Sequence, residues 1–310
     1  MLMERLIEKI IEKKSPIVVG LDPRLENLPQ ELVLSSFEKH GESLKAVSEA
    51  IVAFNKTIID AVHDLVPAVK PQIAFYEQYG LEGMRAYLES CEYAKAKGLI
   101  VIGDIKRGDI GTTSKAYSIA HLGTVHVGAH TFKAFDTDII TVNPYLGDDC
   151  LKEFMDEVKV EDKGLFVLVK TSNKSSGQIQ DLAVDGEKVY EKVANMVANW
   201  NEKTLGPSGY SPIGAVVGAT YPAEMDLLRL KMPHAFFLVP GYGAQGGTAK
   251  DIVGAFNQDG LGAVINSSRG IIYAFENSNL SYAEAARNAT LTMRDDINEA
   301  LENVGKVYWR

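Results

Sequence analysis

The chain has 310 residues, of which 46% are apolar and 24% are charged, as is usual for a globular protein with a large core. Its 32 basic and 41 acidic residues give a net charge of −9, which argues against general attraction to a nucleic-acid polymer or an anionic membrane surface. No stretch of about 18 apolar residues is present, so we expect no membrane span. Cys91 and Cys150 form neither a CxxC pair nor a disulfide framework, which favours a reducing, cytoplasmic location.

The chain is predicted to begin with an amphipathic helix at about residues 1–14, because charged and apolar residues alternate there at helical spacing. Eight short apolar, β-branched runs then read as strands, at 17–21, 68–73, 99–103, 139–142, 165–169, 215–217, 236–239 and 263–265. Stretches with helical periodicity occur at 43–65, 77–97, 113–130, 187–203 and 249–257, and a C-terminal helix is expected at about 282–301.

Alternating strands and helices indicate parallel pairing, because a parallel neighbour requires a crossover connection. Eight such units predict a (β/α)8 TIM barrel that forms one domain over residues 1–310, with a doubly wound open sheet as the alternative. The polar stretch 171–186 is long for a loop between a strand and a helix. It suggests a mobile element over the site, or otherwise a solvated surface loop.

Charged residues follow three of the predicted strands, and in a barrel this is the end at which catalytic groups lie. Strand one ends in Asp22, strand two in Lys70, and strand three in a segment with Asp104, Lys106 and Asp109. A period of two puts residues 100, 102, 104 and 106 on one face, so apolar side chains would fill the barrel and the charges would emerge at its mouth. The alternative is an ion-pair network that is only structural.

A phosphate site is predicted in the loops after strands seven and eight, where barrels commonly bind this anion. The first loop is PGYGAQGG at 240–247, whose glycines let backbone N–H groups approach an anion, and the second is NSSRG at 266–270. Arg269 offers the planar fork that suits phosphate oxygens. The GxGxxG pattern in the first loop comes too late to open a dinucleotide-binding domain, and no acidic residue ends the next strand.

The segment DIKRGDIGTT at 104–113 resembles the DxKxxD signature of orotidine 5'-phosphate decarboxylases, and residues 54–80 are similar to the longer bacterial branch of that family. Asp22, the GYGAQGG loop and Arg269 fall in the expected order, so the resemblance runs from about residue 17 to residue 270. A related 3-keto-hexulose-phosphate aldolase shares DxKxxD, but the K-P-Q-x-A-F-Y-E segment around Lys70 separates the two.

The resemblance implies cofactor-free removal of CO2 from orotidine 5'-phosphate in pyrimidine biosynthesis. Lys106 would donate the proton to C6 of the pyrimidine, and Asp104 would lie beside the departing carboxylate. Lys70 would orient Asp104 and contact the ribose. Asp109 would come from the second subunit of a homodimer and complete the charged array, with Thr113 touching the ribose from the same side.

The remaining family positions concern binding of the nucleotide. Asp22 would bind ribose hydroxyls, Ser172 the pyrimidine, and Gln245 with Arg269 the phosphate. Thr171 and Ser175 are close alternatives to Ser172. Two other functions stay open from the sequence: a metal-dependent phosphosugar aldolase, and a catalytically inert sensor of nucleotide phosphates.

Overall fold

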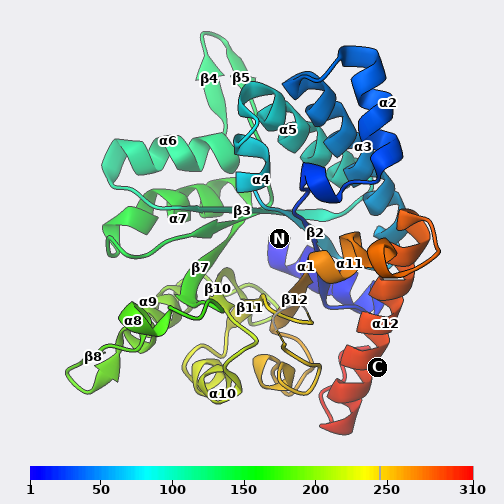
Figure 1. The fold of residues 1–310 in the computed structure, drawn as a ribbon. Coiled ribbons are helices and arrows are strands. Elements are labelled where there is room, and N and C mark those ends of the chain that lie inside the picture. The colour runs from blue at the N-terminus through cyan, green and yellow to red at the C-terminus, as the bar shows by residue number, and fades with distance from the viewer. Residues whose placement is uncertain (244–245, 310) are drawn as a thin grey trace.

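The computed structural model describes residues 1–243 and 246–309, and within them eight parallel strands close into a barrel surrounded by helices (Figure 1). The barrel strands are β1 (Ile17–Leu21), β2 (Ala68–Pro71), β3 (Ile100–Arg107), β6 (Ile139–Val142), β7 (Gly164–Lys170), β10 (Ser211–Val217), β11 (Ala235–Val239) and β12 (Ala263–Ser267). The first and last strands pair with each other, Ile17 lying opposite Ile265, so the sheet has no free edge. This confirms the predicted (β/α)8 fold.

Helices connect the strands and cover the outside of the barrel (Figure 1). The α-helices are α1 (Leu2–Lys13), α2 (Gln30–His40), α3 (Leu44–Val62), α4 (Ala74–Glu77), α5 (Gly80–Ala96), α6 (Gly111–His121), α7 (Asp149–Glu161), α8 (Gly177–Gln180), α9 (Val189–Asn201), α10 (Pro222–Lys231), α11 (Arg269–Ile272) and α12 (Tyr282–Asn303). The short 3-10 helices are η1 (Leu25–Asn27), η2 (Val253–Ala255) and η3 (Ala274–Asn277). None of the helices that the structure describes is both long enough and apolar enough to cross a bilayer.

The barrel strands are buried along almost their whole length, because one face packs inside the barrel and the other under the helices. Continuous apolar runs such as Ile-Val-Val-Gly-Leu in β1 and Ala-Phe-Phe-Leu-Val in β11 provide apolar side chains for both buried faces of the strand. Both terminal helices occur close to their predicted bounds. Helix α12 begins with a capping box in which Ser281 and Glu284 bond each other's backbone N–H groups.

The predicted helix at 113–130 is wrong beyond its first half. Helix α6 ends at His121, and the chain then forms a two-stranded antiparallel hairpin of β4 (Val125–Val127) and β5 (His130–Phe132), which projects from the barrel (Figure 1). Gly128 has a positive φ of 60° in the turn, and β-branched valines precede it. These residue types favour a hairpin, but the apolar residues also recur at helical spacing, which led to the prediction of a helix.

The predicted helix at 249–257 is also wrong, because only the three-residue η2 forms there. Asp251 bonds the backbone N and the hydroxyl of Thr248, and this local bond stabilises a turn. Lys306 Nζ donates to the carbonyl oxygens of Val253 and Phe256, at 2.9 and 2.7 Å. These carbonyls therefore obtain their hydrogen bonds from the C-terminal segment instead of from a continuing helix.

A second small ribbon lies in the long segment after β7. It consists of β8 (Ala183–Val184) and β9 (Glu187–Lys188), and together with α8 it gives the stretch 171–186 secondary structure of its own. Lys170, fully buried at the end of β7, forms an ion pair with Asp181 in this stretch at 2.6 Å. The base of the segment is therefore attached to the barrel.

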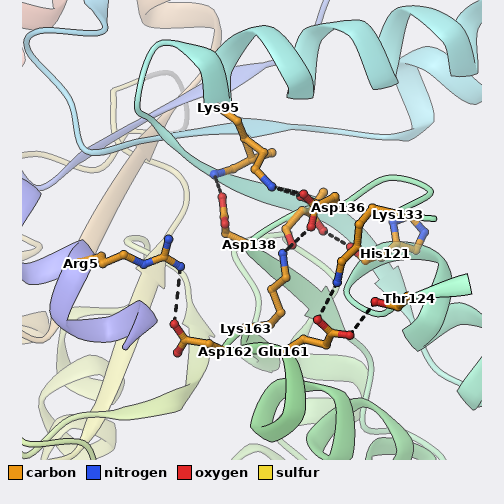
Figure 2. Close-up of polar contacts among 12 residues, drawn as sticks. Arg5, Lys95, His121, Thr124, Lys133, Asp136, Asp138, Glu161, Asp162 and Lys163 are labelled. Atoms are coloured by element: carbon orange, nitrogen blue, oxygen red, sulfur yellow. Dashed lines mark hydrogen bonds and ion pairs between the residues drawn. The ribbon is translucent and has the colours of Figure 1, made fainter. Parts of the chain in front are cut away.

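The amino-terminal end of the barrel carries a network of ion pairs (Figure 2). Asp136 pairs with Lys95 from α5 and with Lys163, which directly precedes β7. Lys163 Nζ also donates to the carbonyl of Thr137 at 2.8 Å, and Asp138 accepts a bond from Val101 N at 2.9 Å. The network ties α5, β3, β6 and β7 together at the end opposite to the charged strand ends.

Candidate active site

A cleft of about 320 Å³ opens at the carboxyl ends of the strands. One wall contains Asp22, Lys70 and Asp104 from strands β1, β2 and β3, and the other contains residues 240–242 and 266–269 from the loops after β11 and β12. The predicted charged strand ends and the predicted phosphate loops thus face the same cleft.

Asp104 lies at the centre of the polar contacts and is only 6% exposed. Its Oδ1 accepts bonds from Lys106 Nζ at 2.5 Å and from Thr141 Oγ1 at 2.8 Å. Its Oδ2 accepts bonds from Lys70 Nζ at 2.9 Å and from Gln72 Nε2 at 2.8 Å. Burial alone would raise the pKa of this carboxyl, but attraction to Lys70 and Lys106 holds the pKa well below its ordinary value. Asp104 is therefore ionised.

The charges of Asp104 and Lys106 on β3 lie at the mouth of the barrel, as expected, but they differ in burial. Asp104 is buried, whereas the Lys106 side chain is 45% exposed and reaches back to it. The pairing of β3 with β6 shifts between Gly103 and Arg107, and Lys106 has a positive φ of 48°. A regular alternation does not hold through this bulge, so the period of two does not by itself explain how Lys106 reaches Asp104.

Lys70 is buried and lies between two carboxylates. Burial alone would lower the pKa of its ammonium group, but Asp104 and Asp22 raise the pKa above its ordinary value. Asp22 Oδ1 is buried and has no hydrogen-bond partner among the described residues, and the same holds for Asn266 Oδ1 on the neighbouring strand β12. Because buried acceptors are costly when unpaired, these two oxygens are suited to accept bonds from ligand hydroxyl or amide groups.

Asp109 and Thr113 do not line the cleft of their own chain, and neither do Lys106 and Ser172. Lys106 nevertheless contacts the lining residue Asp104, whereas Asp109 and Thr113 form no hydrogen bond or ion pair with Asp22, Lys70, Asp104 or Lys106 among the described residues. Asp109 Oδ1 accepts a bond from the adjacent Ile110 N at 2.8 Å, and Thr113 is exposed in the first turn of α6. Within the described residues, no lysine or arginine forms an ion pair with Asp109. The two residues are therefore placed at the surface beside β3.

Thr171, Ser172 and Ser175, the three alternatives for the pyrimidine contact, differ in their hydrogen bonds and exposure. Gln180 bonds both the backbone N and the hydroxyl of Thr171, which also donates to Asn173. Ser175 is exposed, whereas Ser172 is half-buried and packs against Gly218, where an added Cβ would lie 2.9 Å from it. Of the three, Thr171 has its hydroxyl already engaged.

The predicted phosphate loops are described only in part. Gly241 and Arg269 line the cleft, and Arg269 is exposed at the start of α11. Gln245 lies outside the described residues. Tyr273, at the end of α11, accepts a bond from Arg24 N at 2.7 Å and donates to the carbonyl of Asp22 at 3.1 Å. This hydroxyl joins the loop after β12 to the loop after β1.

Comparison with known proteins gives the family. The model of the orotidine 5'-phosphate decarboxylase / HUMPS family matches residues 15–280. The chain is 46% identical over 295 residues to an orotidine 5'-phosphate decarboxylase of Rhodopirellula baltica, covering 93% of this chain and 96% of that protein. The chain belongs to the orotidine 5'-phosphate decarboxylase / HUMPS family.

Solved structures agree with the family assignment. The structure of Leishmania donovani OMP decarboxylase superposes with a TM-score of 0.73 at 33% identity, covering 96% of this chain and 98% of that one. The structure of Leishmania donovani UMP synthase also gives a TM-score of 0.73, at 34% identity, and this chain spans 55% of that longer protein.

Arg24, Gln72 and Thr141 are polar residues at the site that were missed from the sequence, and Arg24 follows β1 by three residues. Gln72 could have been found, because it follows Lys70 by two positions and so shares its face of β2. Thr141 gave a weaker signal, as one hydroxyl within an otherwise apolar strand. Such a residue is ordinarily interpreted as part of the core.

Proposed function

We propose that this protein converts orotidine 5'-phosphate to uridine 5'-phosphate and CO2 without a cofactor. The observation that carries the proposal is the array of Lys70, Asp104 and Lys106 at the mouth of the barrel, in a member of a family with decarboxylases as curated relatives. The array concentrates charge beside a cleft that can hold a small nucleotide.

Lys106 is proposed to stabilise and protonate the reacting carbon. When the bond between C6 and the carboxyl carbon breaks, CO2 leaves and the electron pair stays on C6. No adjacent π system delocalises this pair, so a preorganised positive charge must lie close to it. The ammonium group of Lys106 supplies that charge and then donates its proton, which forms the C6–H bond. Asp104 holds Lys106 in place at 2.5 Å.

The other cleft residues are assigned to binding. Asp22, with its unpaired buried oxygen, and Lys70 are suited to the ribose hydroxyls. Arg269 and Gln245 are assigned to the phosphate, and Ser172 to the pyrimidine. Binding energy from the phosphate, remote from C6, can be used to hold the reacting groups together and so raise the rate.

We further propose a homodimer in which Asp109 and Thr113 of one subunit complete the site of the other. Support comes from their position outside the cleft of their own chain, without any bond to the charged array such as the one that Lys106 makes, and from exposed apolar side chains on the neighbouring loops. Ile110, Tyr145 and Leu146 are 55%, 77% and 51% exposed. The loop after β3 and the loop after β6, which carry these side chains, are joined where Asn143 N donates to Arg107 O. An isologous contact through this surface would cover these side chains twice.

We also propose a cytoplasmic location and one barrel domain over residues 1–310. Both cysteines are buried as free thiols, which suits a reducing compartment. The match to the family over residues 15–280 leaves only the terminal segments outside, and α1 packs on the barrel through Leu2, Leu6 and Ile10.

The proposed function is tested by following the ultraviolet absorbance of orotidine 5'-phosphate in the presence of chelator-treated protein. We expect the absorbance of the substrate to fall with turnover, and uridine 5'-phosphate to accumulate in equal amount. Activity on a phosphosugar that requires an added divalent metal would instead support the aldolase. Tight binding of the nucleotide without turnover would support a sensor.

A further inference from the structure

Thr141 contacts two members of the charged array at once. It lies in β6 between Ile140 and Val142 and is 1% exposed. Its Oγ1 donates to Asp104 Oδ1 at 2.8 Å and accepts from Lys106 N at 3.0 Å. A hydroxyl has one proton and two lone pairs, so the single Oγ1 atom can form both bonds together, which an ammonium group, having no acceptor, could not.

The bond to Lys106 N is made where β3 departs from regular pairing. From Gly103 to Arg107 strand β3 advances four residues, while its partners Ile140 and Val142 on β6 are two residues apart. Lys106 takes up the excess with a φ of 48°, a conformation that few non-glycine residues adopt. The Thr141 hydroxyl therefore satisfies the backbone N–H of the very residue that is strained.

The bond to Asp104 fixes the carboxylate on the side that faces Lys106. Oδ2 is held by Lys70 and Gln72, whereas Oδ1 is held by Lys106 itself and by Thr141. The Lys106 side chain is long and 45% exposed, whereas Thr141 is buried and has a stiff, β-branched side chain. Thr141 is therefore the more rigid partner of Oδ1. One hydroxyl thus sets the carboxylate and the backbone from which the ammonium group extends.

We infer that Thr141 is a positioning residue for the proton donor Lys106, an inference that rests on the proposed function. Its loss would move the ammonium group relative to C6, while Lys70 and Gln72 would still hold the other oxygen of Asp104. A displacement of about 1 Å at reacting groups can cost about 100-fold in rate. We expect the larger effect on kcat, because Thr141 bonds the backbone of Lys106 directly, whereas it reaches the binding residue Lys70 only through Asp104 and forms no hydrogen bond with Asp22 or Arg269 among the described residues.

Two substitutions separate the hydroxyl of Thr141 from its methyl group. Thr141→Val keeps the shape and removes the hydroxyl, and we expect kcat to fall at least about 10-fold with KM within about threefold. Thr141→Ser keeps the hydroxyl and removes a buried methyl, and we expect kcat within about threefold of the wild type but a lower unfolding temperature. A residue that served only packing would give the opposite order in kcat.

Crystal structures of both ligand-free variants provide a readout that does not depend on activity. In Thr141→Val, Lys106 should leave its positive φ, or its Nζ should lose contact with Asp104, and Thr141→Ser should keep both features. An active wild type together with a Thr141→Val variant of unchanged kcat would overturn the inference and leave the proposed function intact. If the wild type decarboxylated nothing, the proposed function would fail, and unchanged geometry in Thr141→Val would then overturn the positioning role separately.

Discussion

At the scale of single residues, Lys106 is partly exposed, whereas its partner Asp104 is buried. Substitution of Lys106 is therefore expected to affect catalysis more than stability. Asp104 has four hydrogen-bond donors around it, of which Lys106 is the most exposed. Removing Lys106 leaves Asp104 paired with the buried Lys70 at 2.9 Å, so no buried charge becomes isolated. Removing Asp104 would leave Lys70 without its closest partner.

We predict that Lys106→Ala abolishes decarboxylation while the fold survives. A proton donor contributes at least about 100-fold, so turnover should drop below about one hundredth of the wild type. The unfolding temperature should stay close to that of the wild type, because alanine also carries a Cβ at the positive φ and Asp104 keeps Lys70 as its partner. Lys152→Ala, on the exposed face of α7, is the control and should keep full activity. Turnover above about a tenth of the wild type would contradict the role of Lys106.

His121 gives a pH dependence of stability with a defined sign. Burial, and then repulsion from Arg107, lowers its pKa to about 4. An unfolded histidine titrates near pH ~6.5, so the unfolded state binds a proton that the folded state rejects between these values. The contribution of neutral His121 is complete above about pH 6.5 and is lost as the pH falls toward 4.

We predict that the free energy of unfolding decreases by about 2 kcal/mol between pH 7 and pH 5 through His121 alone. His121→Phe, which keeps the stack on Phe135, should lack this part of the decrease. His126→Phe changes an exposed hairpin residue and should retain it. Urea unfolding at the two pH values measures the difference, and parallel curves for wild type and His121→Phe would refute the assignment.

At the scale of elements, the loops after β1 and β12 are joined by the hydroxyl of Tyr273. We predict that Tyr273→Phe raises KM more than it lowers kcat, because it loosens Asp22 relative to Arg269 without touching Lys106. Loss of a buried hydrogen-bonded hydroxyl should also cost about 1–3 kcal/mol of stability.

The control for Tyr273→Phe is Tyr282→Phe. Tyr273 and Tyr282 both stack on Phe54, but the hydroxyl of Tyr282 bonds Thr57 on α3, away from the cleft. Steady-state kinetics on both variants distinguishes a role in the cleft from a general loss of packing. Equal KM values for the two variants would exclude the proposed link between the loops.

The elements that could be predicted from the sequence were those with a strong local pattern. All eight barrel strands appear, because buried parallel strands are continuous apolar runs between polar loops. The two incorrect helices were decided by contacts that local pattern does not contain. Lys306 binds the carbonyls near η2 from 50 residues away, and a turn at Gly128 competes with helical spacing before β5.

Part of the candidate site could likewise be predicted from the sequence, and part could not. Asp22, Lys70 and Asp104 were predictable, since a charged side chain at the end of a buried strand is costly unless it is paired or used in a site, and the structure brings the three to one cleft. Thr141 could not be assigned, because its role depends on a shift in register between β3 and β6 that one strand alone cannot reveal. Gln245 lies outside the described residues, so its role stays a prediction.

At the scale of the whole molecule, the location of Asp109 outside its own cleft predicts complementation between subunits. Lys106→Ala and Asp109→Ala proteins should each be inactive. If subunits exchange at random, half of the dimers are hybrids, and each hybrid has one site with both lesions and one with neither. About a quarter of wild-type activity should return on mixing.

Mixing Lys106→Ala with Asp104→Asn is the matched control, because both residues serve the cleft of their own chain. Every site then carries at least one lesion, and activity should stay absent. Native mass spectrometry confirms that hybrids form in both mixtures. If hybrids form and the mixture of Lys106→Ala with Asp109→Ala remains inactive, the shared site is refuted while the decarboxylase assignment stands.

The ion pairs of Asp136, drawn in Figure 2, lie at the amino-terminal end of the barrel, and the charged array of Asp104 lies at the carboxyl ends of the strands. Asp138 directly precedes β6 and lies three residues before Thr141, or roughly 10 Å at about 3.3 Å per residue. Substitutions separated by more than about 7–10 Å and sharing no partner usually add in their effects. Thermal stability and substrate preference can consequently be engineered independently in this barrel. Substitutions around Lys163 would serve stability, and substitutions at the opposite end would adapt the cleft to other nucleotides.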